Sequence, residues 1–151
     1  MPEAVVRRLG AEDIAPMRAM LAMFGDAFAD PHAYHSAQPD DAYLALLLAS
    51  DSFIALAAVA DGAVVGGIAA YVLDKFEQAR REVYLYDLAV AEPYRRQGIA
   101  SALIGELRRV AAAIGAYMIF VQADLGDDPA IALYEGIGDR ENVLHFDIAV
   151  P

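Results

Sequence analysis

The chain contains no cysteine. It can therefore form no disulfide, no thiolate metal site and no cysteine-linked acyl-enzyme. Histidine is also scarce. His145 stands alone, and the one ligand-like spacing among the three histidines is His32-x-x-His35, on a proline-flanked segment where a surface or substrate-loop position is the favoured interpretation. The sequence therefore predicts an activity that uses no metal.

Positive charge is scarce as well, with 11 Lys and Arg against 22 Asp and Glu and a net charge of -11. Such a surface repels phosphate backbones and attracts cations, so we expect no nucleic-acid partner. The longest apolar stretch, Ala63 to Leu73, is too short to cross a bilayer. The first residues show no basic segment followed by an apolar one. We therefore expect a cytoplasmic protein with no membrane contact.

Hydrophobic residues are abundant, at 58% of 151 residues, which predicts a single domain over 1–151 with a buried core. The spacing of apolar residues and the turn signals predict alternating strands and helices. The expected strands are 3–9, 53–60, 64–73, 82–90, 117–122 and 143–148, and the expected helices are 11–24, 40–48, 98–114 and 129–136. The polar segment 25–40 is expected to be a loop or a short helix. This order predicts an α/β (α+β) fold, with a mixed sheet covered by helices on both faces.

The segment from the end of the fourth expected strand, at Val90, to the helix starting near Gly98 is the most informative. A helix N-terminus exposes unpaired N–H groups that bind phosphate, and glycine lets a ligand approach the backbone. Arg95 and Arg96 add positive charge, and six of the eleven basic residues lie between positions 80 and 109. The pattern favours an anion site, although an exposed Arg pair on an ordinary turn gives the same letters. Neither a P-loop nor a dinucleotide fingerprint is present.

Arg95-Arg96-Gln97-Gly98-Ile99-Ala100 resembles the pyrophosphate loop of the GCN5-related N-acetyltransferases. Leu88-Ala89-Val90 before it, and 129–138 after it, are similar to that family in the same order. Nearly the whole chain resembles the aminoglycoside 3-N-acetyltransferases of the gentamicin/fortimicin-resistance type. The discriminating parts are Tyr86-Asp87 and the block 122–130. The chain departs from that family at Ala37, where members carry histidine.

The resemblance implies an N-acetyltransferase fold, acetyl-CoA as co-substrate and a homodimer. It implies direct transfer, within a ternary complex, to the 3-amino group of the 2-deoxystreptamine ring of an aminoglycoside. It leaves open whether Asp127 contacts the pantetheine amides or faces the substrate. The residues implied for the cofactor are Leu88, Ala89, Val90, Arg95, Arg96, Gln97, Gly98, Ile99, Ala100, Ser101, Gln122, Asp127, Ala130 and Tyr134.

Acetyl transfer from a thioester to an amine requires the amine to lose a proton and the leaving thiolate to gain one. Asp87 lies just before the implied cofactor segment, so its carboxylate would bind the ammonium group and accept its proton, directly or through water. The alternative is an ordinary strand residue on an exposed face. The resemblance assigns the proton donor to Tyr134, and the alternative there is packing on the helix face with Ala130 and Ile131.

Acidic residues outside this centre favour a polycationic acceptor. Residues 19–74 hold seven acids and no Lys or Arg, and residues 110–151 hold seven acids against one Arg. The expected substrate-binding residues are Tyr86, Asp87, Glu82, Asp124, Asp128, Asp147 and His35, with Tyr84 as a weaker candidate. Two other functions stay open: transfer to a polyamine, a peptide amine or another small amine, and a non-catalytic acyl-CoA-binding domain. The presence of Asp87 and Tyr134 argues against the second.

Overall fold

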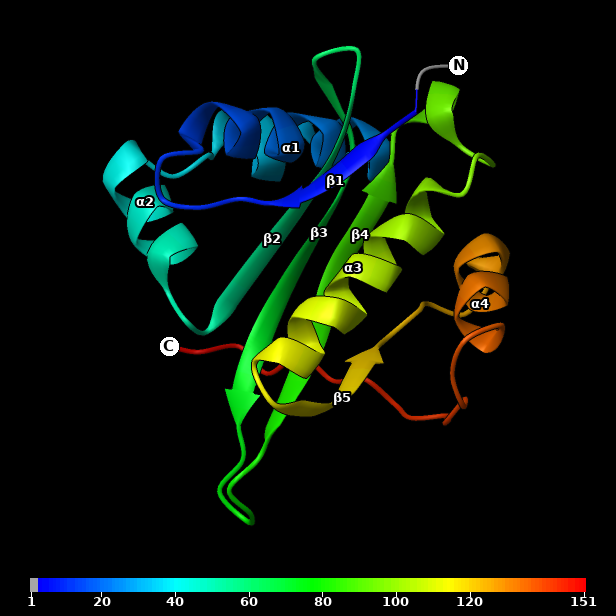
Figure 1. Ribbon diagram of the computed structural model, residues 1–151. Coiled ribbons are helices and arrows are strands. Elements are labelled where there is room, and N and C mark those ends of the chain that lie inside the picture. The colour runs from blue at the N-terminus through cyan, green and yellow to red at the C-terminus, as the bar shows by residue number, and fades with distance from the viewer. Residues whose placement is uncertain (1–2) are drawn as a thin grey trace.

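Residues 3–151 are described by a computed structural model, which contains a five-stranded sheet in the order β1-β2-β3-β4-β5 (Figure 1). The first four strands are antiparallel neighbours, and β5 runs parallel to β4. The strands are β1 (Val5–Arg8), β2 (Phe53–Ala60), β3 (Ala63–Asp74), β4 (Arg81–Val90) and β5 (Ala116–Val121). The mixed sheet predicted from the sequence is confirmed.

Helices cover both faces of this sheet (Figure 1). They are α1 (Ile14–Ala27), α2 (Asp41–Ala49), α3 (Ile99–Ala113) and α4 (Asp128–Glu135), with short helical turns η1 (His32–Ser36) and η2 (Glu92–Tyr94). The polar segment 25–40, expected to be a loop or a short helix, contains the end of α1 and the short helical turn η1.

The alternation of side chains along each strand divides the buried residues into two cores. Val83 and Leu85 of β4 pack with Leu103 and Leu107 of α3 on one face. On the other face, β2 meets α1 and α2, where the buried residues include Met20, Phe24, Leu44, Phe53 and Ala55. Helices thus cover part of both faces of the sheet, whereas Tyr71, Tyr86 and Met118 stay exposed on its strands.

The prediction of a strand over 143–148 is wrong for this structure. From residue 139 to the end the chain forms neither helix nor strand, and every residue there is exposed. The alternation typical of a strand is present in the sequence, but a strand exists only when a neighbour supplies its hydrogen bonds. No strand among residues 3–151 lies beside this segment.

Candidate active site

A one-residue bulge in β4 decides which way Asp87 points. The pairing with β3 passes from Ala70 opposite Leu85 to Ala69 opposite Asp87, so Tyr86 is the extra residue. Leu85 is buried on the α3 side, and uninterrupted alternation would put Asp87 there too. Asp87 instead lines a cavity of about 190 Å³ on the side of α1 and α2. The bulge therefore brings a carboxylate into an otherwise apolar space.

The cavity changes the acid–base behaviour of Asp87. Most of its lining is apolar and comes from α1, α2 and the sheet, and it also contains Tyr34 and Tyr71. Burial raises the pKa of Asp87 above its usual range, and a hydrogen bond from the Tyr34 hydroxyl, 3.3 Å from Oδ2, acts in the opposite direction. A carboxylate with a raised pKa is a stronger base, and its charge attracts an ammonium group. Asp87 is half-buried, so it is not an ordinary strand residue on an exposed face, which was the alternative considered for it.

Tyr34 is a residue that the sequence analysis missed. It lies on η1, where its ring packs edge-on against Phe24 and beside Phe28, with ring centres 6.1 and 5.7 Å away. Burial, followed by the charge of Asp87, raises the pKa of Tyr34 to about 12, so the phenol keeps its proton and donates a hydrogen bond to the carboxylate. The only signal in the sequence is an aromatic residue inside a polar, proline-flanked segment.

Beyond Leu85, β4 loses its parallel neighbour. The ladder with β5 ends at Leu85 opposite Val121, whereas pairing with β3 continues to Val90. Residues 87–90 therefore present one backbone edge that no strand among residues 3–151 covers. Backbone groups on such an edge can bind a ligand that carries amides. Leu88, Ala89 and Val90, to which the family resemblance assigns a cofactor role, lie on this edge.

The loop between β4 and α3 has the geometry of a phosphate site. Gly98 is the N-cap of α3 with a φ of 81°, and a Cβ built there meets nothing within 4 Å. No side chain caps the helix, so the N–H groups of its first turn, Ile99 to Ser101, are free for an anion. Arg96 also has a positive φ, of 62°, a backbone conformation that is strained for a residue with a side chain.

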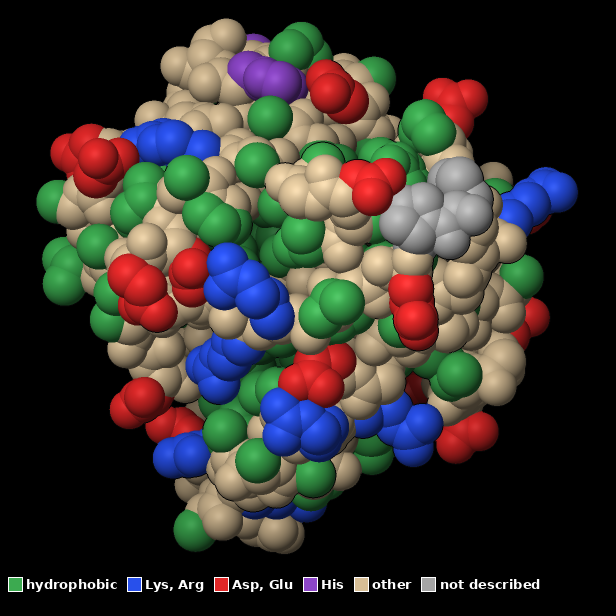
Figure 2. All heavy atoms as spheres, turned by 45° about the horizontal axis from the view of Figure 1, so that its top comes forward, with side chains coloured by type: hydrophobic (Ala, Val, Ile, Leu, Met, Phe, Trp, Pro, Cys, Tyr) green, Lys and Arg blue, Asp and Glu red, His purple; other side chains and the backbone are tan. Residues whose placement is uncertain are grey.

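Positive charge is available at this loop. Arg95 donates from Nε to the Val90 carbonyl at 2.9 Å, which ties the loop to β4. Neither Arg95 nor Arg96 pairs with a carboxylate in the part of the chain that the structure describes, whereas Arg81 and Arg109 pair with Asp74 and Glu106. Figure 2 shows that Lys and Arg side chains are interspersed with Asp and Glu side chains on the face that it presents. The loop and its arginines therefore fit a pyrophosphate.

Tyr134 lies on the other side of the sheet from the Asp87 cavity. It is partly buried against the core that α3 covers. Burial, with a smaller effect of the Asp127 charge, raises the pKa of Tyr134 to about 12, so its hydroxyl stays protonated at neutral pH and can act as a donor. Asp127 caps α4 by accepting from the Ala130 N–H at 3.4 Å. The two expected proton-transfer groups thus lie on opposite faces of the sheet.

Glu82 and Gln122 have partners away from Asp87. The Glu82 carboxylate accepts from the Tyr117 hydroxyl at 2.6 Å and lies 3.3 Å from Lys75 Nζ, and these contacts hold the pKa of Glu82 below its usual range. Gln122 accepts from the Tyr84 hydroxyl at 2.7 Å. Glu82 is five residues from Asp87 along β4, or roughly 16 Å at strand spacing. The structure therefore does not bring Glu82 and Asp87, both expected to bind substrate, close together.

The remaining expected substrate residues are spread over the surface. Asp124 and Asp128 are exposed between β5 and the first turn of α4. His35 pairs with Asp26 at 3.3 Å, and Asp147 pairs with His145 at 2.8 Å in the terminal segment. Tyr86 alone adjoins Asp87. Among residues 3–151, no three His, Asp or Glu side chains gather as a metal site would require.

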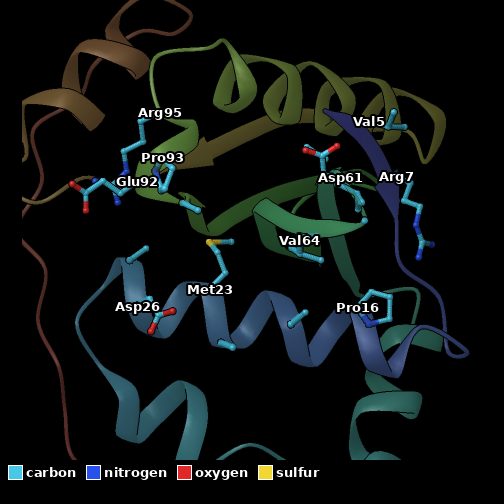
Figure 3. Close-up of a pocket in the computed structure, with 18 of the residues that line it drawn as sticks. Val5, Arg7, Pro16, Met23, Asp26, Asp61, Val64, Glu92, Pro93 and Arg95 are labelled. Atoms are coloured by element: carbon cyan, nitrogen blue, oxygen red, sulfur yellow. The ribbon is translucent and has the colours of Figure 1, made fainter. Parts of the chain in front are cut away.

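A wider groove of about 1180 Å³ lies between α1 and the ends of β1, β2 and β3 (Figure 3). Glu92, Pro93 and Arg95 lie at one end of it, and Asp61 and Arg7 lie toward the other. Arg95 is the one expected cofactor residue in its lining, and Asp87 is not part of it. The groove therefore borders the phosphate loop but is separate from the cavity at Asp87.

No helix in the described range is long and apolar enough to cross a membrane.

Comparisons with known proteins agree with this geometry. An aminoglycoside acetyltransferase from an uncultured soil metagenomic sample is 55% identical with a TM-score of 0.96, over 98% of this chain and 99% of that one. A second, from an uncultured soil metagenomic sample and in complex with sisomicin, is 29% identical with a TM-score of 0.90, over 98% and 97%. An aminoglycoside N-acetyltransferase in complex with CoA shares the fold, at 18% identity and a TM-score of 0.77, over 99% and 97%.

No curated protein sequence matches the chain. A family model does, over residues 18–138, a stretch that runs from α1 to just past α4 and so includes η1, the β4 bulge, the phosphate loop and Tyr134. With that match and the close agreement of the whole fold, the chain belongs to the acetyltransferase (GNAT) family.

Proposed function

We propose that this acetyltransferase transfers the acetyl group of acetyl-CoA to the 3-amino group of the 2-deoxystreptamine ring of aminoglycosides of the gentamicin, sisomicin and fortimicin type, and so confers resistance to them. The observation that carries the proposal is Asp87, a half-buried carboxylate that the β4 bulge directs into a cavity beside the open edge of the strand. Two similar structures are aminoglycoside acetyltransferases, and one of them binds sisomicin.

The residues of the chain divide the work between the two faces of the sheet. The acceptor amine enters from the side of α1 and α2, where Asp87 binds its ammonium form and takes the proton, directly or through water. The backbone of 88–90 holds the pantetheine arm along the open edge of β4 and directs an N–H at the thioester carbonyl. Tyr134 supplies a proton to the leaving sulfur from the opposite face. Acetyl-CoA supplies the activated acetyl group.

The phosphate loop holds the other end of the co-substrate. The first-turn N–H groups of α3 and the side chains of Arg95 and Arg96 neutralise the pyrophosphate, and the bare Cα of Gly98 lets it lie against the backbone. Gln122, Asp127 and Ala130 line the exit from β5 to α4.

The acceptor end depends on negative charge. A polycationic acceptor is attracted by the net charge of -11. We propose that Asp124 and Asp128, exposed after β5, contact its outer amino groups. The same charge suits a polyamine or another small amine, which is the alternative acceptor. We further propose that the enzyme works as a homodimer, and in the cytoplasm, where acetyl-CoA is made.

Release of CoA in the presence of gentamicin, sisomicin, kanamycin and spermidine tests the proposal. We expect turnover with gentamicin and sisomicin, and a product whose two-dimensional NMR spectrum shows acetylation at the 3-amino group. Faster turnover of spermidine would favour the polyamine alternative. Binding of acetyl-CoA without turnover of any of the four would contradict both the aminoglycoside acceptor and the polyamine alternative.

A further inference from the structure

Aromatic side chains form a continuous row on the side of the sheet where α1 and α2 lie. The row runs from Phe53 on β2 through Tyr71 on β3 and Tyr86 and Tyr84 on β4 to Phe120 on β5. Successive ring centres are 4.5 to 5.6 Å apart. Phe53 is buried, but Tyr71 is 39% and Tyr86 59% exposed, so the middle of the row is open to a ligand.

The row begins beside the proposed base and leads away from the co-substrate. Phe53, Tyr71 and Asp87 line the same cavity. Residues 88–90, proposed to hold the pantetheine arm, follow Asp87 along β4, whereas Tyr84 and Tyr86 precede it. The part of an acceptor that extends away from the thioester therefore meets Tyr86 next to Asp87.

The ring faces suit a positively charged group. The face of a neutral phenol carries the negative part of its quadrupole, and burial raises the pKa of Tyr71 and of Tyr84, so both rings stay neutral. Tyr86 meets its two neighbours at steep angles of 90° and 64°, so neither of them stacks flat on it. Within residues 3–151, the one cation that lies over an aromatic ring is Arg80, above Tyr117. The row is therefore free to take a cation from a ligand.

The row is also held in place before any ligand binds. The Tyr84 hydroxyl donates to Gln122 at 2.7 Å, and the Tyr84 ring stacks on Phe120 with an angle of 18° between the ring planes. Tyr84 thus supports Tyr86 from β4 and β5, and the buried Phe53 supports Tyr71 from β2. A surface that is already ordered loses little side-chain freedom on binding.

We infer that the ring faces of Tyr86 and Tyr71 bind a second ammonium group of the acceptor, separate from the one that reacts at Asp87. This inference rests on the proposed function and describes how that site recognises the rest of its substrate. Asp87 is the one acidic residue that lines its cavity. A second carboxylate there would raise the pKa of Asp87 further by repulsion, whereas a ring face attracts a cation without adding a charge.

Calorimetry with gentamicin and CoA, which together give no turnover, tests the contact directly. We expect Tyr86→Leu to raise the Kd of gentamicin about 2- to 30-fold, the range of a cation–π contact, and to leave the Kd of CoA unchanged. Tyr117→Leu is the matched control, because Arg80 already lies over that ring, and it should keep the original Kd. An equal rise in both variants would overturn the inference.

A second series keeps the size and shape of the ring nearly constant. Tyr86→Phe removes only the hydroxyl and should bind gentamicin almost as well as the unaltered enzyme. One, two and then three fluorine atoms on that phenylalanine withdraw negative charge from the ring face, so the Kd should rise with each. A Kd that ignores fluorine, or a full loss of affinity in Tyr86→Phe itself, would overturn the cation–π contact. A circular dichroism spectrum shows that each variant is folded.

The two proposals fail in different ways. If the unaltered enzyme neither binds nor acetylates gentamicin, the proposed function is wrong and this inference falls with it. If gentamicin is acetylated and its Kd does not respond to fluorine at position 86, only the inference about the aromatic row is overturned.

Discussion

At the scale of single residues, the site depends on a carboxylate whose pKa is balanced by two opposing effects. Burial raises the pKa of Asp87 and the Tyr34 hydrogen bond lowers it. In Asp87→Asn the shape of the side chain is kept and its charge and basicity are lost. We expect kcat/KM for gentamicin to fall steeply and the KM for acetyl-CoA to change little. Asp51→Asn, which removes an equal charge from an exposed turn, is the control. Full turnover in Asp87→Asn would make this aspartate an ordinary strand residue.

Tyr34 is predicted to set the pH at which Asp87 becomes active. Tyr34→Phe keeps the packing against Phe24 and removes the donor, so the pKa of Asp87 should rise further. Because Asp87 acts as its anion, the acidic limb of kcat/KM against pH should move to higher pH. Tyr117→Phe also removes a phenol that donates to a carboxylate, but to that of Glu82, and should leave the limb in place. An unmoved limb in Tyr34→Phe would show that the hydrogen bond has no effect on the base.

Tyr134 is the proposed proton donor to the leaving sulfur. Tyr134→Phe keeps the buried ring and deletes the hydroxyl. Loss of a general acid typically lowers the rate by roughly 10²–10⁴-fold, so we expect a fall in kcat of that order with the KM of both substrates retained. Steady-state kinetics with gentamicin measures it. A kcat within about twofold of the unaltered enzyme, where a lost general acid should cost far more, would leave Tyr134 a packing role only.

Some residues of the candidate site can be predicted from the sequence and others cannot. Asp87 can be predicted because it directly precedes a recognisable motif, the strand end that leads into the proposed phosphate loop. Tyr34 and Tyr71 are not, because what matters is their meeting with Asp87 in one cavity, and they are 53 and 16 positions away from it in the chain. Glu82 lies on the same strand as Asp87 but contacts Tyr117 and Lys75 instead, because residues five positions apart on a strand are far apart in space.

At the scale of elements, the proposed phosphate site in the loop before α3 depends on backbone geometry. Gly98→Val puts a branched side chain at a φ of 81° and into the open space over the loop. The conformational strain is about 1–2 kcal/mol, which the fold should tolerate. We therefore expect a folded variant with a much higher KM for acetyl-CoA. Gly105→Ala, on α3 where an added Cβ also meets nothing within 4 Å, is the control. An unchanged KM in folded Gly98→Val would remove the phosphate from this loop.

The elements themselves follow closely from the sequence. The periods of two and 3.6 residues locate the sheet and all four helices, because burial on one face of each element imposes those periods. The strand expected over 143–148 fails for a different reason. Alternation shows that a segment is suited to a sheet, but the neighbour that completes it can belong to another molecule. The bulge at Tyr86 is also invisible, since one extra residue leaves the composition of β4 unchanged.

At the scale of the whole molecule, charge is separated by function. The surface carries a net charge of -11, while Arg95 and Arg96 keep free cations at the phosphate loop. A polycationic acceptor should be steered by the wider field, whose reach shrinks from about 30 Å at 0.01 M salt to about 3 Å at 1 M. We expect kcat/KM for gentamicin to fall with added potassium chloride. The affinity for acetyl-CoA, measured by calorimetry over the same range, should change much less because its contacts are short. An equal response of both would contradict steering of a polycation.

The bulge in β4 has a consequence for how this enzyme can change over time. The side of the sheet on which the carboxylate stands is fixed by the number of residues between Leu85 and Leu88, and not by which residues they are. Point substitutions leave that number intact, so they can alter the lining of the cavity step by step. The gain or loss of a single codon within this stretch would reverse the direction of the following side chains of β4. Asp87 would then point to the side of α3. The acceptor pocket is thus open to gradual drift and closed to changes in length.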